Sequence, residues 1–291
     1  MSLPFKQVIR SYRWRLLLTY VLTFVENVFE LLYPFAIGLA IDGLLRGDGL
    51  LSTAPLAAMW TAHIVTGTAR QLYDTRLFSV MYGSAAAAMI VEQRAQGVST
   101  SEVSARVDMM EEMIDFLEYE LPTCARSVIG ILGSIGMLFF YDVTAGLITA
   151  GLLVPVAMVQ RLYGKRAFAL NSRLNDRWER QVDAVADGER RRVDIHVRAL
   201  AKWRVKLSDA QAAAWSVTDV LSLVTAVLVL LHITGTDGIQ AGAIFAALAY
   251  VLAVTDSLEE APVIVEQVGR LVDISRRVGS DDGEAATGIT G

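Results

Sequence analysis

The sequence predicts an all-α, polytopic membrane protein, and three observations support this fold class: composition, the length of the apolar runs and the placement of positive charge. Of 291 residues, 54% are hydrophobic and 20% are charged, whereas soluble domains carry about 25% charged residues. The mean hydropathy is +0.43. Six stretches approach the roughly 20 apolar residues that a helix needs to cross a bilayer. They lie near 16–41, 54–78, 122–141, 143–160, 215–233 and 239–258.

The first stretch follows several basic residues, as the apolar segment of a signal peptide does. Its apolar run continues to Ile41 without a convincing small-residue cleavage site. We therefore expect it to be retained as the first transmembrane helix.

The connections between the stretches predict the orientation. With the N-terminus inside, the outer loops are 42–53, the turn at Asp142 and 234–238. Only Arg46, among 26 Lys and Arg residues, falls in them. Because positive charge is retained on the cytoplasmic side, we expect an N-in, C-in protein of the cell inner (plasma) membrane.

The inner segments 79–121 and 161–214 are long, charged and rich in helix-forming residues. The membrane helices are therefore expected to continue about 25–40 Å into the cytoplasm at 1.5 Å per residue. Residues 279–291 lack an apolar period and predict a disordered tail. The expected organisation is one six-helix domain over 1–278 followed by this tail.

Several chemistries are excluded by composition. One cysteine, Cys124, and three scattered histidines leave no disulfide framework and no metal-ligand spacing. A net charge of -5 argues against nucleic acid as a partner. The sequence contains no G-x-x-x-x-G-K-[ST] phosphate loop and no catalytic triad pattern. We expect no enzymatic activity, no ATP hydrolysis by this chain and no cofactor.

Local motifs add a resemblance. The stretch Ser99 to Asp108, the entry into the third span at 115–122 and the segment Val268 to Ile274 resemble the membrane domain of exporter-type ABC transporters. The resemblance implies a homodimer in the lipid bilayer whose inner loops dock a separate ATPase subunit. The residues expected at these docking turns are Ser101, Glu102, Arg106, Gly188, Arg191 and Asp194.

The expected function is transport of an unidentified solute. A separate ATPase subunit would drive it, or the proton gradient would, as a resemblance to ATPase-free, ABC-like peptide transporters implies. The alternative is a non-transporting membrane scaffold or sensor whose cytoplasmic loops bind a partner.

Ionisable side chains inside the spans mark the candidate site, because each one costs about 2.5–3.5 kcal/mol in hydrocarbon unless it has a partner or a watery cavity. Counted from the outer helix ends at 1.5 Å per residue, Glu26 and Arg70 lie at matching depths of about 22 and 24 Å. They predict an ion pair, which would be purely structural in the simplest interpretation. Glu30 has only His63 near its level and is therefore the expected proton-binding carboxylate. The predicted substrate or proton cavity comprises Glu26, Asn27, Glu30, His63, Arg70 and Asp74.

Overall fold

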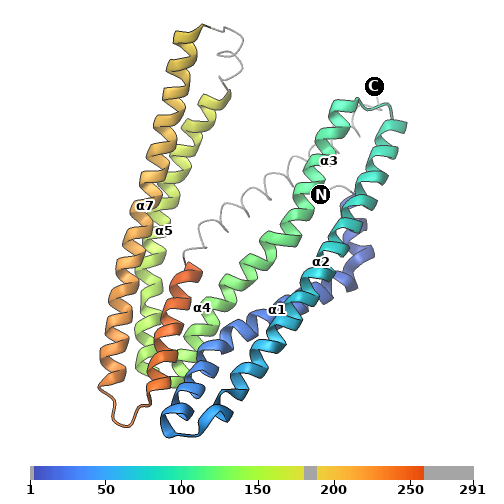
Figure 1. Ribbon diagram of the computed structural model, residues 1–291. Helices are drawn as coiled ribbons and strands as arrows, with labels where there is room; N and C mark the ends of the chain where they lie inside the picture. Colours follow the sequence, from blue (N-terminus) through green and yellow to red (C-terminus); the bar gives the residue numbers. More distant parts are fainter. Residues whose placement is uncertain (1–2, 180–188, 259–291) are drawn as a thin grey trace. The chain divides into compact units, whose positions relative to one another are not determined.

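The computed structural model describes residues 3–179 and 189–258, and within these ranges the chain forms helices joined by short turns, without a strand (Figure 1). The long helices are α1 (Leu3–Arg46), α2 (Ala54–Ala95), α3 (Thr100–Asp115), α4 (Leu121–Tyr141), α5 (Val143–Glu179) and α7 (Arg190–Thr234). A 3₁₀ turn (Gly49–Thr53) precedes α2, and a π-helical turn (Phe116–Glu120) joins α3 to α4. A last helix covers Ala241–Leu258. The all-α prediction is confirmed.

Within the described residues, five helical segments are long and apolar enough to cross a membrane, which makes the chain a multi-pass membrane protein. They are Val8–Arg46, Thr100–Tyr141, Val143–Leu174, Arg190–Thr234 and Ala241–Leu258. The sixth predicted span, 54–78, lies within the 42-residue helix α2. It is not among these five segments, and its predicted span contains His63, Arg70, Asp74 and Arg76.

The turns fall close to the predicted positions, although α1 continues to Arg46, into the loop predicted at 42–53, and α3 is helical from Thr100. Gly47 and Gly49, between α1 and the 3₁₀ turn, have φ values of 87° and 71°, a left-handed conformation that only glycine adopts without strain. Asp142 is the single residue between α4 and α5, and α7 ends at Thr234. Gly97, with φ of 80°, turns the chain between α2 and α3.

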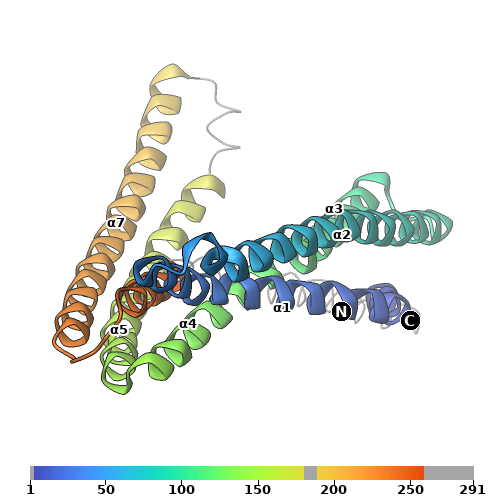
Figure 2. The ribbon, with the colours of Figure 1, turned by 60° about the horizontal axis from the view of Figure 1, so that its bottom comes forward.

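The described residues belong to two compact units. The first contains α1, α2, α3, α4 up to Ser134 and residues 240–246. Its main apolar core lies where the N-terminal part of α1 meets the C-terminal half of α2 and α3. Leu16, Phe78, Met81, Met110 and Ile114 are at its centre. Figures 1 and 2 both show α2 and α3 running side by side.

The second unit contains the end of α4, the helices α5 and α7, and residues 247–258 of the last helix. The helices α5 and α7 lie side by side (Figure 1). Leu138, Val156, Val229 and Tyr250 are buried within this unit. The predicted tail 279–291, and the part of the predicted domain beyond residue 258, lie outside the described residues, so the 1–278 domain stays a prediction.

Candidate functional site

A buried ion network joins α1 to α2 in the first unit. The Arg70 Nε donates to the Glu26 carboxylate, and the Arg70 Nη1 lies 2.8 Å from Asp74 Oδ2, one helical turn along α2. The exposed fractions of the three side chains are 13% for Glu26, 21% for Arg70 and 6% for Asp74. The expected Glu26–Arg70 pair is therefore present, and Asp74 is its third member.

His63 and Tyr33 extend this network along the same pair of helices. The Tyr33 hydroxyl forms a hydrogen bond with His63 Nδ1, and His63 Nε2 lies 3.8 Å from Glu26 Oε1. When Tyr33 donates to Nδ1, a neutral imidazole carries its proton on Nε2, the nitrogen that faces Glu26. Protonation of the ring would then place a positive charge beside this carboxylate. We call Glu26, Tyr33, His63, Arg70 and Asp74 the α1–α2 network.

Gly67 allows the helices to approach closely at this level. A Cβ atom at position 67 would lie 2.9 Å from Glu26 Oε1. The absent side chain thus makes room for the carboxylate that Arg70 holds.

Two buried polar atoms, one within this network and one on the residue that follows Glu26, lack a hydrogen-bond partner among the described residues. They are Asp74 Oδ1 and Asn27 Nδ2, and their residues are 5% and 4% exposed. An unpaired buried polar atom costs about 1–3 kcal/mol, so both atoms call for water or a bound solute. Asn27, a predicted cavity residue, is therefore buried with a hydrogen-bond donor of its own that is free among the described residues.

The structure corrects the expected surroundings of Glu30. Its Oε1 lies 3.2 Å from Arg126 Nη2 of α4, so Glu30 has a permanent cation as its partner. His63 instead contacts Glu26 and Tyr33. Depth along the sequential helices α1 and α2 does not reveal this partner, because Arg126 lies on α4.

Two network or pair members, Tyr33 and Arg126, were missed by the sequence analysis. Tyr33 follows Glu26 by seven residues, which places both on one face of α1, so the helical period could have found it. Arg126 has no such signal, since its partner lies 96 positions away in the sequence.

The predicted docking turns are defined in part. The Ser99 side chain caps α3 by accepting a hydrogen bond from the Glu102 backbone N–H at 3.3 Å, and Glu102 pairs with Arg106 at 2.8 Å. Ser101 occupies the same first turn of α3, and Arg191 lies in the first turn of α7. Asp194 pairs with Arg198 of α7 at 3.0 Å. Gly188 lies outside the described residues.

Aspartates also close the turns at the opposite helix ends. The Gly242 backbone N–H donates to Asp42 at 2.7 Å, and the Ala145 N–H donates to Asp142 at 2.7 Å. Asp142 also lies 3.0 Å from His232 Nε2. The Ala145 N–H lowers the pKa of Asp142, with a smaller contribution from His232.

Comparison with known proteins adds the family. The model of the ABC transporter transmembrane region matches residues 5–242. The chain belongs to this family. The match contains the whole α1–α2 network and the predicted docking turns, and the exporter resemblance inferred from the inner-loop motifs agrees with it. A search of curated proteins found no match.

Proposed function

We propose that this chain is the membrane domain of a transporter that moves an unidentified solute, and that it works as a homodimer. The family membership and the α1–α2 network support this proposal. Charged groups are retained inside membrane helices at considerable cost where they face a path for ions, protons or solutes. The unpaired atoms of Asp74 and Asn27 support such a path, because water or a solute within it would satisfy them.

The proposed topology has six crossings, with α2 as the second and both termini in the cytoplasm. Six helices offer too little wall to enclose a large path and also shield the buried charges from lipid. A second copy would supply the missing wall.

Two energy sources fit this proposal. A separate ATPase subunit would dock at the turns near Ser101 and Asp194. The proton gradient would instead load a titratable group in the path. His63 is the best candidate for this group because its ring nitrogens face Tyr33 and Glu26, so that a proton gained by the ring would lie beside a carboxylate. Glu30 ranks second because Arg126 already compensates the charge of its carboxylate.

The test uses the purified full chain in liposomes with labelled short peptides, the solute class that the resemblance implies. Flux is measured with and without an imposed pH gradient, for the wild type, for His63→Gln and for Glu30→Gln. We expect gradient-driven flux in the wild type, its loss in His63→Gln and its retention in Glu30→Gln. A melting curve for each variant separates loss of coupling from loss of folding.

The reverse pattern would return the proton role to Glu30. Flux that requires added ATP and a separate ATPase would assign the energy source to that subunit. If peptides fail, the same assay is repeated with amino acids and organic cations. Absence of flux under every condition would favour the scaffold or sensor alternative.

A further inference from the structure

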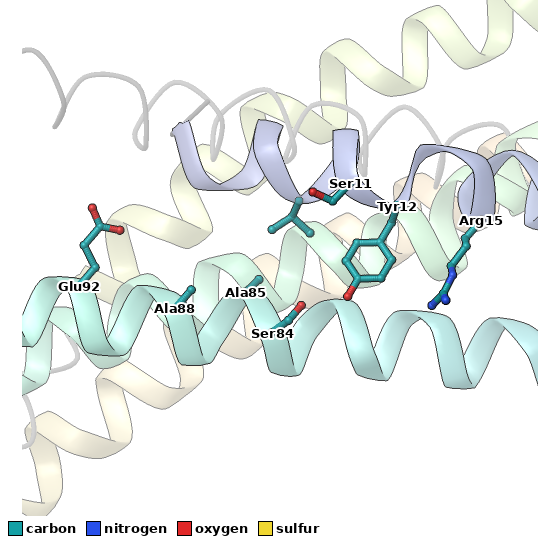
Figure 3. Close-up of a pocket in the computed structure, with 8 residues that line it drawn as sticks. Ser11, Tyr12, Arg15, Ser84, Ala85, Ala88 and Glu92 are labelled. Carbon is teal, nitrogen blue, oxygen red and sulfur yellow. The ribbon is translucent and has the colours of Figure 1, made fainter.

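An open groove of about 650 Å³ lies between the N-terminal part of α1 and the C-terminal half of α2, away from the α1–α2 network. The α1 side includes Ser11, Tyr12 and Arg15, and the α2 side includes Ser84, Ala88 and Glu92. Figure 3 shows Arg15 and Glu92 at opposite ends of this groove, with the small side chains between them. We propose that its Arg15 end binds the phosphate of an anionic phospholipid.

Helix geometry places Arg15 at the level of lipid headgroups. Arg15 precedes Ile41, the outer end of the predicted span, by 26 positions, or about 39 Å at 1.5 Å per residue. The hydrocarbon core is about 30 Å thick, and the bilayer with headgroups is about 40–45 Å thick. At the average helix tilt of about 20°, this length projects to about 37 Å along the bilayer normal, which is beyond the hydrocarbon core but within the headgroup layer, about 5–7.5 Å thick on each side. Arg15 therefore falls in the headgroup layer of the leaflet opposite the α1–α2 loop.

The exposed face of α1 marks the same boundary. Large apolar side chains are exposed from Trp14 onward, at Trp14, Leu17, Leu18, Val21 and Phe24. Trp14 is 70% exposed, and tryptophan concentrates at the interface between hydrocarbon and headgroups. A lipid whose acyl chains cover this face has its headgroup beside Arg15.

The charges around the Arg15 end of the groove suit a phosphate. Among the described residues, no carboxylate forms an ion pair with Arg15, and the sequence has no acidic residue before Glu26. The guanidinium lies 5.9 Å from the centre of the Tyr12 ring, and the Tyr73 hydroxyl donates to the Arg15 carbonyl at 3.5 Å. Both the backbone and the side chain of Arg15 are therefore positioned, as a bidentate phosphate contact requires.

The positive field favours an anionic lipid over a zwitterionic one. Arg10 and Arg13 are exposed on the same turns of α1, and each basic residue near an anionic surface adds about 1 kcal/mol of attraction. Glu92 lies at the far end of the groove, on the membrane-distal side of Ser84 along α2. The lipid phosphate therefore meets the basic end of the groove first.

The test measures lipid retention by native mass spectrometry of the detergent-solubilised full chain, titrated with phosphatidylglycerol or phosphatidylcholine. The variants are Arg15→Gln, which removes the groove cation, and Arg13→Gln, which removes a neighbouring cation outside the groove. A third variant, Ala88→Leu, fills the groove at an exposed position without a change in charge. We expect phosphatidylglycerol to bind about tenfold more weakly to Arg15→Gln, as for loss of one charge-assisted contact, and less than about twofold more weakly to Arg13→Gln.

If Arg15→Gln and Arg13→Gln weaken the binding of phosphatidylglycerol equally, the effect comes from general surface charge and the proposal is overturned. Equal affinity of the wild type for both lipids would overturn the preference for an anionic headgroup. Inorganic phosphate, tested in a lipid-free arm, should not raise the melting temperature. If it does so through Arg15, the site serves a free phosphate and the lipid assignment is wrong. This test requires no flux assay, so its failure and that of the proposed transport function are distinguishable.

Discussion

The α1–α2 pair buries ionisable side chains, whereas the unit that contains the α5–α7 pair buries hydroxyls. In the first pair, Glu26, Arg70 and Asp74 are ionisable, largely buried and mutually paired. Within the described part of the second unit, the buried polar side chains are all hydroxyls, at Thr149, Thr218, Ser222, Thr225 and Thr255. Thr218 and Thr225 donate to carbonyls of their own helix at 3.0 and 2.9 Å.

This contrast separates two kinds of helix contact. These two hydroxyls need nothing from the neighbouring helix, and Thr149 and Ser222 have no hydrogen-bond partner among the described residues. Within the described residues, the α5–α7 contact therefore depends on packing and not on buried ion pairs. An ionised group needs a partner from another helix or water, so the α1–α2 contact depends on a specific set of charges. The fold therefore retains the more costly arrangement in the α1–α2 pair, where the proposed path lies.

The largest expected effect follows removal of Arg70. Arg70→Ala leaves Glu26 and Asp74 as adjacent buried carboxylates without their cation, and loss of one partner of a buried pair costs about 3–5 kcal/mol. We expect a strongly lowered melting temperature and a low folded yield in nanodiscs. The matched change in the other pair, Thr225→Ala, should cost only about 1 kcal/mol.

Neutralising the whole cluster tests whether charge, and not shape, causes this loss. The combination Glu26→Gln, Arg70→Met and Asp74→Asn should recover most of the stability, since neutral replacements of buried ion clusters are often tolerated. If Arg70→Ala melts like the wild type, the cluster is hydrated and the assumed burial is wrong.

A smaller effect is expected at the glycines. Gly67→Ala places a Cβ against the Glu26 carboxylate, which cannot swing away without weakening its contact with Arg70. The resulting strain, about 1–3 kcal/mol, should exceed the roughly 0.5–1 kcal/mol gained from replacing a helical glycine. Gly164→Ala in α5 meets no atom within 4 Å, so this variant should be stabilised.

Melting temperatures measured in one detergent should fall for Gly67→Ala and rise for Gly164→Ala. In a Glu26→Ala background the steric conflict disappears, so Gly67→Ala should become neutral or stabilising there. A destabilising effect of the same size in both backgrounds would show that Gly67 is required for another contact.

The smallest effect is expected at Asp142, in the turn before α5. Asp142→Ala removes the cap on the Ala145 N–H and the contact with His232, and cap removal costs about 0.5–2 kcal/mol. Because the pKa of Asp142 is lowered in the folded state, the stabilisation from its ionised form is present at pH values above the ordinary pKa of an aspartate. It is lost as the pH falls through the lowered pKa. The difference in melting temperature between the wild type and Asp142→Asn should therefore shrink in acid, and a pH-independent difference would contradict the charge contribution.

The sequence was sufficient for the helices and much of the site because both depend on local patterns. Apolar runs predicted the five described helices that are long and apolar enough to cross a membrane, and the breaks at Asp142 and after Thr234 predicted two of the turns. The Glu26–Arg70 pair was also predictable, since a short connection forces α1 and α2 to lie antiparallel and the rise per residue then sets their relative depth.

The remaining contacts depended on how distant helices rotate and pack. Depth along a helix does not specify which face a side chain occupies, so His63 was matched with Glu30 although it faces Glu26 and Tyr33. The partner of Glu30 lies on α4, and the groove beside Arg15 forms between residues more than 65 positions apart in the sequence. Local periodicity records the chemistry that each helix carries, whereas pairing across helices follows from three-dimensional packing, which has no local signature in the chain.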